Sequence, residues 1–204
     1  MNIIFIGPQG SGKGTQAKIL AEELKISHIS TGDLFRSLTK GSLKEEVDSY
    51  INKGNLVPDE LTVRILKQRI EQDDCKEGFI LDGFPRNIAQ AELLDKITKI
   101  NKVVEINISD ELAIKRISER LSCKKCGAVY NLTTNPLKKQ NICDKCQEEL
   151  YRRADDNPEA IKKRLETYHK ETKPVLKKYK SILITIDGSQ EIDKVAEQIT
   201  ENLN

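Results

Sequence analysis

Two patterns of apolar and polar residues alternate along the chain, and they predict alternating strands and helices. Short runs rich in β-branched residues predict strands over 2–6, 26–30, 79–82, 103–108 and 182–186. Longer segments with apolar residues three or four positions apart predict helices over 11–24, 31–40, 43–53, 59–72, 88–97, 110–121, 158–170, 173–180 and 190–202. Strands that alternate with helices form a parallel sheet, so we expect an α/β fold with a five-stranded parallel sheet as its core.

Two segments interrupt this alternation and predict inserts in the core. The first, 30–59, contains two short helices, which Gly41 separates and Gly54 ends. The second, 121–156, breaks the rhythm with paired cysteines and turn residues. A chain of 204 residues has room for one large domain with small inserts. We therefore expect a helical insert, a cysteine-bearing insert and one core domain formed by 1–29, 60–120 and 157–204.

The charge of the chain is nearly balanced, with 34 basic and 32 acidic residues. A net charge of +2 gives no reason to expect a nucleic-acid partner or an acidic membrane surface, so any anion site must be local. There is no apolar run of about 20 residues and no charged leader followed by an apolar segment. We expect a cytoplasmic protein with no membrane contact.

A glycine-rich loop, GPQGSGKGT at Gly7–Thr15, follows the first predicted strand and opens a helix. In that context its backbone N–H groups can converge on phosphate oxygens, and Lys13 supplies a positive charge for the outer phosphates. The alternative is a simple turn between a strand and a helix. The loop departs from G-x-x-x-x-G-K-[ST], because Gly14 stands where a Ser or Thr hydroxyl usually ligates Mg²⁺ and Thr15 comes one place late.

Asp82 ends the apolar run FILD, the predicted third strand. The carboxyl ends of parallel strands meet at one edge of a sheet, so this carboxylate is expected to face the phosphate loop. There it can hold Mg²⁺ through water molecules, since Mg²⁺ keeps several waters in protein sites. The alternative is an aspartate that caps the turn before Gly83.

Arginines are scarce, at 9 against 25 lysines, so each one marks a place where a planar, forked donor is needed. Arg36 ends the stretch ISTGDLFR and Arg86 ends GFPR, both beside loops that contain glycine. Two such donors suit a second phosphate group. The alternatives are that both arginines are surface charges and that Ser30 or Thr31 merely caps a helix.

Four of the five cysteines form two C-x-x-C pairs, Cys123/Cys126 and Cys143/Cys146, with 16 residues between the pairs. This spacing is typical of a zinc site, and four thiolate ligands form a closed, structural site. The alternatives are two disulfides or four free thiols. A nucleic-acid-binding zinc ribbon is a rival function, which we disfavour because Tyr130 is the one aromatic residue between the pairs. The fifth cysteine, Cys75, is expected to be a packing residue.

These motifs occur in the order GPQGSGKGTQA, STGDLFR, LVPDELT, FILDGFPR, RRADD, KKRLETYH and TIDGS. Together they resemble the adenylate kinases, a nucleoside monophosphate kinase family, over the whole chain and both inserts. The resemblance is to bacterial-type members with a zinc-bearing lid. It implies a monomer that transfers a phosphoryl group from Mg·ATP to AMP, giving two ADP. The insert 30–59 would bind the nucleoside monophosphate, and 121–156 would be the lid, with one structural Zn²⁺ on the four cysteines.

The resemblance also assigns residues. ATP would contact Gly10, Ser11, Gly12, Lys13, Gly14, Thr15, Arg116, Arg120, Val129, Tyr130 and Gln190. AMP would contact Thr31, Arg36, Asn55, Leu56, Val57, Gly83, Phe84, Pro85, Arg86, Gln90, Arg153 and Arg164. The catalytic set would be Lys13, Arg86, Arg120, Arg153 and Arg164. Members of this family also have Gly-Thr after the loop lysine, with Mg²⁺ held mainly through waters and acids such as Asp82.

The implied reaction requires alignment, neutralised charge and exclusion of water rather than covalent chemistry by the protein. It requires no general base, because the attacking phosphate is already an anion, so His28 and His169 are expected to be structural or surface residues. A UMP/CMP kinase is the closest alternative, since Thr31 and Gln90 favour adenine by resemblance only. A phosphate-loop GTPase is disfavoured because the chain has no N-K-x-D stretch.

Overall fold

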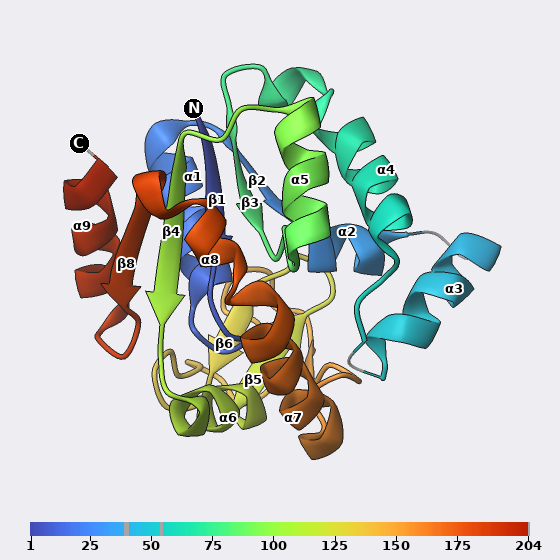
Figure 1. Cartoon of the computed structure of the whole chain (residues 1–204). Coiled ribbons are helices and arrows are strands. Elements are labelled where there is room, and N and C mark those ends of the chain that lie inside the picture. The colour runs from blue at the N-terminus through green and yellow to red at the C-terminus, as the bar shows by residue number, and fades with distance from the viewer. Residues whose placement is uncertain (39–40, 54, 204) are drawn as a thin grey trace.

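The computed structural model describes residues 1–38, 41–53 and 55–203. A five-stranded parallel sheet forms the centre of the fold. The strands are β1 (Asn2–Ile6), β2 (Ser27–Ser30), β3 (Phe79–Asp82), β4 (Lys102–Asn107) and β8 (Leu183–Asp187), in the order β2-β3-β1-β4-β8 (Figure 1). The predicted α/β class and its five-stranded parallel sheet are confirmed. After β1 the chain forms β2 and β3 on one side and later β4 and β8 on the other, so the carboxyl end of β1 is a switch point where ligands bind in such sheets.

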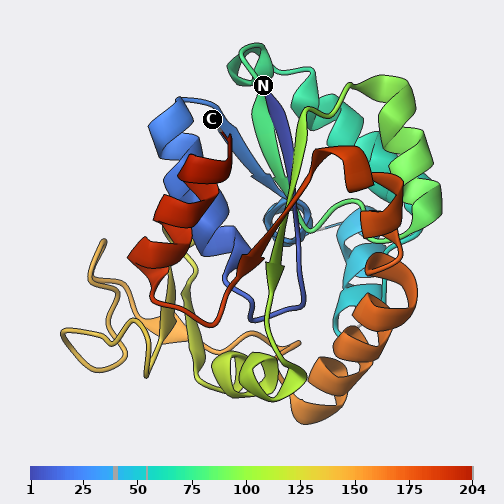
Figure 2. The same cartoon turned by 60° about the vertical axis from the view of Figure 1, so that its left-hand side comes forward.

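Helices cover both faces of the sheet (Figures 1 and 2). On one face, alternate residues of β1, Ile3 and Phe5, pack with α1 (Lys13–Leu24) and α9 (Ile192–Leu203). On the other, Ile4 and Ile6 belong to a cluster with residues of α4 (Asp59–Ile70), α5 (Ile88–Ile97) and α8 (Val175–Lys178). Because successive side chains of a strand point to opposite faces, the continuous apolar run of β1 is buried on both sides.

Both inserts contribute to apolar clusters apart from the main core. Phe35 of α2 (Thr31–Ser37), Val47 of α3 (Ser42–Ile51) and Val57 form one such cluster together with Leu61 of α4. In the second insert, β5 (Arg120–Cys123), β6 (Val129–Asn131) and β7 (Leu150–Tyr151) form an antiparallel sheet in the order β6-β5-β7. This second insert is drawn in yellow and tan in Figure 1 and lies below the carboxyl end of the main sheet.

Several predicted boundaries are wrong. The helix predicted over 11–24 begins at Lys13, because residues up to Gly12 form the phosphate loop. The helix predicted over 110–121 is α6 (Asp110–Ser118); it stops early because β5 begins at Arg120 and pairs with β6. The helix predicted over 158–170 is α7 (Pro158–Thr167), followed by a π-helical turn, Tyr168–Thr172.

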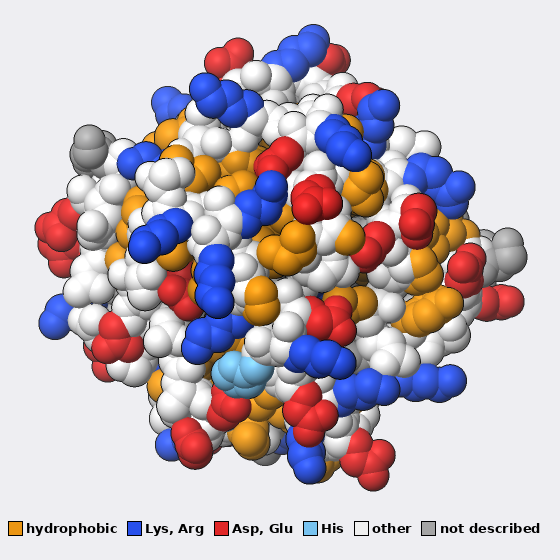
Figure 3. Space-filling view, viewed as in Figure 1, with side chains coloured by type: hydrophobic (Ala, Val, Ile, Leu, Met, Phe, Trp, Pro, Cys, Tyr) orange, Lys and Arg blue, Asp and Glu red, His pale blue; other side chains and the backbone are white. Residues whose placement is uncertain are grey.

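The remaining differences are small. Short 3₁₀ turns form at Asp73–Cys75 and Lys180–Ile182. Two predictions fall outside the described residues. They are the last two residues of the helix predicted over 31–40, and Gly54, the predicted end of the helix over 43–53. No helix within the described ranges is both long and apolar enough to cross a membrane. Basic and acidic side chains are interspersed across the face seen in Figure 3, as the balanced charge predicts.

Candidate active site

A cavity of about 670 Å³ lies at the carboxyl edge of the main sheet, between the phosphate loop, the first insert and the second. Nearly all the residues predicted to bind nucleotides line it. They are Gly10–Thr15, Thr31, Arg36, Asn55, Leu56, Val57, Asp82, Gly83, Arg86, Gln90, Arg116, Arg120, Val129, Tyr130, Arg153, Arg164 and Gln190. The exceptions are Phe84, whose side chain is 1% exposed in the main core, and Pro85, which lines a separate cavity of about 60 Å³. Phe84 can therefore reach a ligand only through its backbone.

The phosphate loop has the backbone geometry that an anion site needs. Gly10 and Gly12 have φ of 81° and 94°, which side chains other than glycine rarely adopt. A Cβ at Gly10 would also lie 2.7 Å from the carbonyl oxygen of Ala113. These turns bring the start of α1 to the cavity, where unpaired N–H groups and the positive end of the helix favour an anion. The hydroxyl of Ser11 is buried there without a hydrogen-bond partner among the described residues.

Lys13 is the first residue of α1, and its Nζ donates to the backbone carbonyl of Pro8 at 3.2 Å. Burial lowers the pKa of Lys13 to about 8; the carboxylate of Asp82 opposes this shift, and the positive charges of Arg86 and Arg120 add to it. The side chain is therefore a buried cation without enough negative charge around it. A polyphosphate in the cavity would supply that charge.

The geometry around Asp82 explains why glycine stands at position 14. A Cβ at Gly14 would lie 3.0 Å from Asp82 Oδ2, so a Ser or Thr side chain there would press on the carboxylate. The register of β1 and β3 pairs Phe5 with Asp82 and so places this acid beside the phosphate loop. A side chain at position 14 would therefore require the Asp82 carboxylate to shift slightly.

Asp82 has the properties of an acid that holds a hydrated cation. Its Oδ1 is buried and has no hydrogen-bond partner among the described residues. Burial of Asp82 favours its neutral form and so raises its pKa. This effect is outweighed by His28, whose Nε2 lies 3.8 Å from Oδ2, and by the positive charges of Lys13 and Arg86, so that the pKa of Asp82 is lowered. An ionised carboxylate with an unsatisfied oxygen suits the water shell of Mg²⁺.

The two histidines differ in position. His28, expected to be structural or on the surface, lines the cavity next to Asp82. His169 lies half-exposed outside it, with Nε2 2.9 Å from both oxygens of Asp110.

Six of the nine arginines line the cavity: Arg36, Arg86, Arg116, Arg120, Arg153 and Arg164. Several are held by neighbours that orient their guanidinium groups. Arg86 Nε donates to the carbonyl of Gly83 at 2.8 Å, Arg116 to the carbonyl of Gly188 at 2.8 Å, and Arg153 Nε to Ser122 Oγ at 3.0 Å. Burial and the neighbouring charges of Arg120 and Arg36 lower the pKa of Arg153 to about 10. This crowding of cations is the electrostatic signature of a site for several phosphate groups.

Two acids that sequence reasoning did not single out pair with these arginines. Asp156 accepts from Arg120 and from Arg164, whose Nη2 lies 3.2 Å from Oδ1, and Asp155 accepts from Arg164 Nη1. The side chain of Asp156 is only 3% exposed. The sequence did contain a signal for Asp155 and Asp156. Once the scarce arginines are expected to be buried, each guanidinium group requires a carboxylate held in a fixed position beside it.

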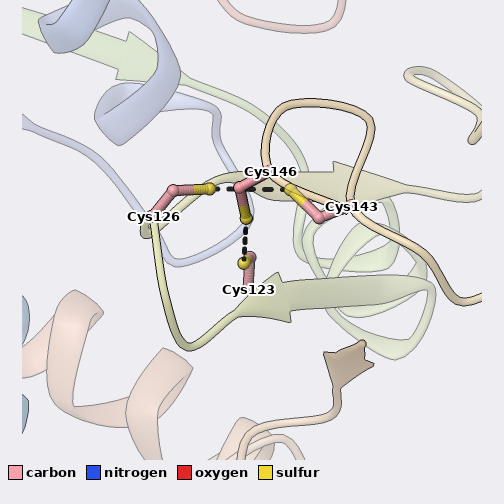
Figure 4. A group of neighbouring side chains, drawn as sticks. All are labelled: Cys123, Cys126, Cys143 and Cys146. Atoms are coloured by element: carbon pink, nitrogen blue, oxygen red, sulfur yellow. Dashed lines mark hydrogen bonds between the residues drawn. The ribbon is translucent and has the colours of Figure 1, made fainter. Parts of the chain in front are cut away.

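The four paired cysteines converge in the second insert (Figure 4). Their Sγ atoms all lie within 4.8 Å of one another, with Cys123 3.4 Å from Cys146 and Cys126 3.5 Å from Cys143. A tetrahedral zinc with Zn–S bonds of about 2.3 Å places its sulfurs about 3.8 Å apart, so the cluster fits a structural zinc. None of the four is joined to another in a disulfide, so the structure does not support the alternative of two disulfides.

The surroundings of the cluster favour the thiolate form at Cys143, whereas burial and hydrogen bonds among the neighbouring thiols raise the pKa of Cys126 and Cys146. Burial opposes ionisation of Cys143, but hydrogen bonds from the hydroxyl of Tyr130 and from the backbone N–H groups of Cys146 and Lys145 outweigh it and lower the pKa of Cys143 to about 6. Thiolate is the form that ligates a metal. Cys75 is buried in the main core, 3.0 Å from Arg69 Nη1, as expected of a packing residue.

Comparison with known proteins agrees with this geometry. The family model described as adenylate kinase matches residues 5–184. The chain is 48% identical to an adenylate kinase of Caldanaerobacter subterraneus subsp. tengcongensis, with 100% of this chain and 96% of that protein aligned. It is also 48% identical to an adenylate kinase of Methanocella arvoryzae (98% and 96%) and 47% identical to one of Ruminiclostridium cellulolyticum (100% and 99%).

Proposed function

We infer the roles of individual side chains from one premise: the chain belongs to the adenylate kinase family and is an adenylate kinase, an enzyme that acts on ATP and AMP. The observation that carries the assignment of roles is the convergence of Lys13 and six arginines on one cavity. The catalysed exchange, Mg·ATP + AMP ⇌ 2 ADP, brings two highly charged nucleotides together, and their mutual repulsion must be overcome.

We assign ATP to the side of the cavity formed by the phosphate loop. The backbone N–H groups of Gly10–Thr15 and the Lys13 ammonium would hold the β- and γ-phosphates. Arg116, Val129, Tyr130 and Gln190 would surround the rest of that nucleotide. This assignment is supported by the positions of the four residues, which line the same cavity from α6, β6 and the segment after β8.

We assign AMP to the side formed by the first insert and the end of β3. The guanidinium groups of Arg36 and Arg86 would bind its phosphate, since both are forked donors at the cavity wall. The backbone there is well ordered by side chains: Ser30 caps α2 through the N–H of Asp33 at 3.3 Å, and Thr31 Oγ1 donates to the carbonyl of Gly83 at 3.0 Å. Asn55–Val57, Gly83–Pro85 and Gln90 would enclose the nucleoside.

Transfer follows from alignment and charge. Arg120, Arg153 and Arg164 line the same cavity and would bind the migrating phosphoryl group, whose negative charge is spread over three oxygens. In the free enzyme Asp155 and Asp156 hold Arg120 and Arg164 in place. The AMP phosphate attacks as an anion, so no side chain has to remove a proton.

Two metals enter this proposal. Asp82 would hold the water shell of Mg²⁺, which would neutralise charge on the ATP phosphates. One Zn²⁺ on Cys123, Cys126, Cys143 and Cys146 would be structural, because four thiolates leave no position for a substrate.

We also propose the organisation of the chain. Separate apolar clusters support a core domain of 1–29, 60–120 and 157–204, an AMP-binding insert of 30–59 and a lid of 121–156. All residues assigned to both nucleotides come from one chain, which supports a monomer, and the thiol cluster supports a reducing, cytoplasmic location. We assign no nucleic-acid role to the lid.

The experiment that tests this function compares four acceptors with Mg·ATP by measuring ADP formation. AMP is expected to exceed CMP, UMP and GMP in kcat/KM by at least about tenfold, because a buried polar edge in the acceptor site rejects a base that cannot pair with it. A preference for UMP or CMP would contradict the assignment of the acceptor.

The lowered pKa of Lys13 predicts a pH dependence of ATP binding. Burial sets this pKa at about 8 in the free enzyme, and a bound triphosphate would raise it by favouring the ammonium form. Above about pH 8 the complex with ATP then carries more protons than the free enzyme, so ATP binding takes up protons. The affinity for ATP is therefore expected to fall as the pH rises. Calorimetry at about pH 8.5 in buffers of different ionisation enthalpy would measure this uptake. The uptake should vanish in Lys13→Met; equal uptake in both proteins would refute it.

A further inference from the structure

The acceptor side of the cavity contains one buried side-chain amide, that of Gln90. It lies on the first turn of α5, lines the cavity and is only 1% exposed. Leu56 and Val57 line the same cavity and lead directly into Asp59, which hydrogen-bonds Gln90. This end of the cavity therefore combines apolar side chains with a buried amide, an arrangement that suits the flat faces and polar edge of a base.

The hydrogen bonds of Gln90 determine which way its amide faces. The backbone N–H of Arg86 donates to Oε1 at 2.7 Å, and Nε2 donates to Asp59 Oδ1 at 2.7 Å. An N–H can only donate and an ionised carboxylate can only accept. Exchanging the amide oxygen and nitrogen would therefore place two donors together at Arg86 and two acceptors together at Asp59.

Asp59 is itself held in position. Asn87 Nδ2 donates to its Oδ1 at 3.1 Å and to its Oδ2 at 3.2 Å. The Oδ1 of Asn87 in turn caps α5 by accepting from the backbone N–H of Gln90 at 2.7 Å. Asp59 does not line the cavity, so it acts on the cavity only through Gln90.

The orientation leaves a defined pattern for a ligand. An amide has two N–H hydrogens and two oxygen lone pairs, and these contacts use one of each. One donor and one acceptor remain, side by side. Adenine presents the complement, the acceptor N1 beside the N6 amino donor, whereas hypoxanthine and guanine present an N1–H donor beside the O6 acceptor.

We propose that Asp59 is a specificity-determining positioning residue, which holds the Gln90 amide in the orientation that accepts a 6-aminopurine and rejects a 6-oxopurine. The proposal rests on the assignment of Gln90 to the AMP site. It explains base choice by the polarity of the amide rather than by the size of the pocket.

The test uses AMP and inosine 5′-monophosphate as acceptors, since they share ribose and phosphate and differ in the polarity of the base edge. In Asp59→Ala the AMP/IMP ratio of kcat/KM is expected to fall about tenfold or more, mainly through a higher KM for AMP. The KM for ATP should change less than about twofold. Asp59→Asn keeps one acceptor oxygen and should give an intermediate ratio.

Glu60→Ala is the matched control, because Glu60 is exposed, follows Asp59 in the first turn of α4 and contributes the same charge at the start of that helix. Its AMP/IMP ratio should equal that of the unaltered enzyme. An unchanged ratio in folded Asp59→Ala, or in Asp59→Asn if the alanine variant does not fold, would overturn the proposal. If the unaltered enzyme does not phosphorylate AMP, the assignment of function fails instead.

Discussion

Replacing Lys13 with methionine is expected to lower kcat/KM about 10³-fold or more while leaving the fold at least as stable as before. Lys13 is a buried loop side chain that lines the cavity where we propose that the ATP phosphates bind, and fixed charges in a water-excluded site contribute most to phosphoryl transfer. Burial and the nearby arginines lower its pKa to about 8, so the charge is costly in the free enzyme. Methionine keeps the unbranched stem without that cost.

Two measurements test this prediction together: steady-state ADP formation and thermal melting without nucleotide. The control is Lys67→Met, which removes an equal charge from the exposed face of α4, where the nearest acid is Glu71 at 3.9 Å. Lys67→Met should keep normal activity. A Lys13→Met variant with more than a tenth of normal activity, or with a clearly lower melting temperature, would contradict the role assigned to Lys13.

The sequence predicts best the features that depend on local pattern. The apolar run of β1 buries side chains on both faces of the sheet and leads into a glycine loop, so strand, loop and helix were identified together. The scarcity of arginine singled out Arg36 and Arg86, and the family resemblance added the other four that line the cavity. Both signals are visible without any tertiary contact.

Features that depend on contacts between distant segments were not predictable. The lid strands β6 and β7 have three and two residues, too few to show an alternation, and the pairing with β5 determines them. The link from Asp59 to Gln90 spans 31 positions and two helices. The burial of the Phe84 side chain in the main core was not predictable either, because nothing in the motif GFPR shows which way that side chain points.

Removing zinc is expected to lower the melting temperature by about 10 °C or more, while activity well below that temperature largely survives. The apolar cluster of the lid consists mainly of Leu121, Ala128, Tyr130 and Leu150 packed around the cysteines. So few apolar residues cannot stabilise 36 residues alone, and structural zinc sites contribute folding free energy directly. Arg120 lies in β5, which leads into Cys123, so a modest loss of rate through misplacement is expected as well.

The metal would be extracted with a thiol-reactive reagent and a chelator, and its loss verified by elemental analysis before melting and rate are measured separately. Because Cys75 is a fifth thiol outside the cluster, the same treatment of Cys75→Ser is the control, and both proteins should lose the same stability. An unchanged melting temperature would refute a structural role for the four-cysteine cluster. Complete loss of activity in a lid that is still folded would instead indicate a metal that acts in the reaction, which four thiolate ligands do not allow.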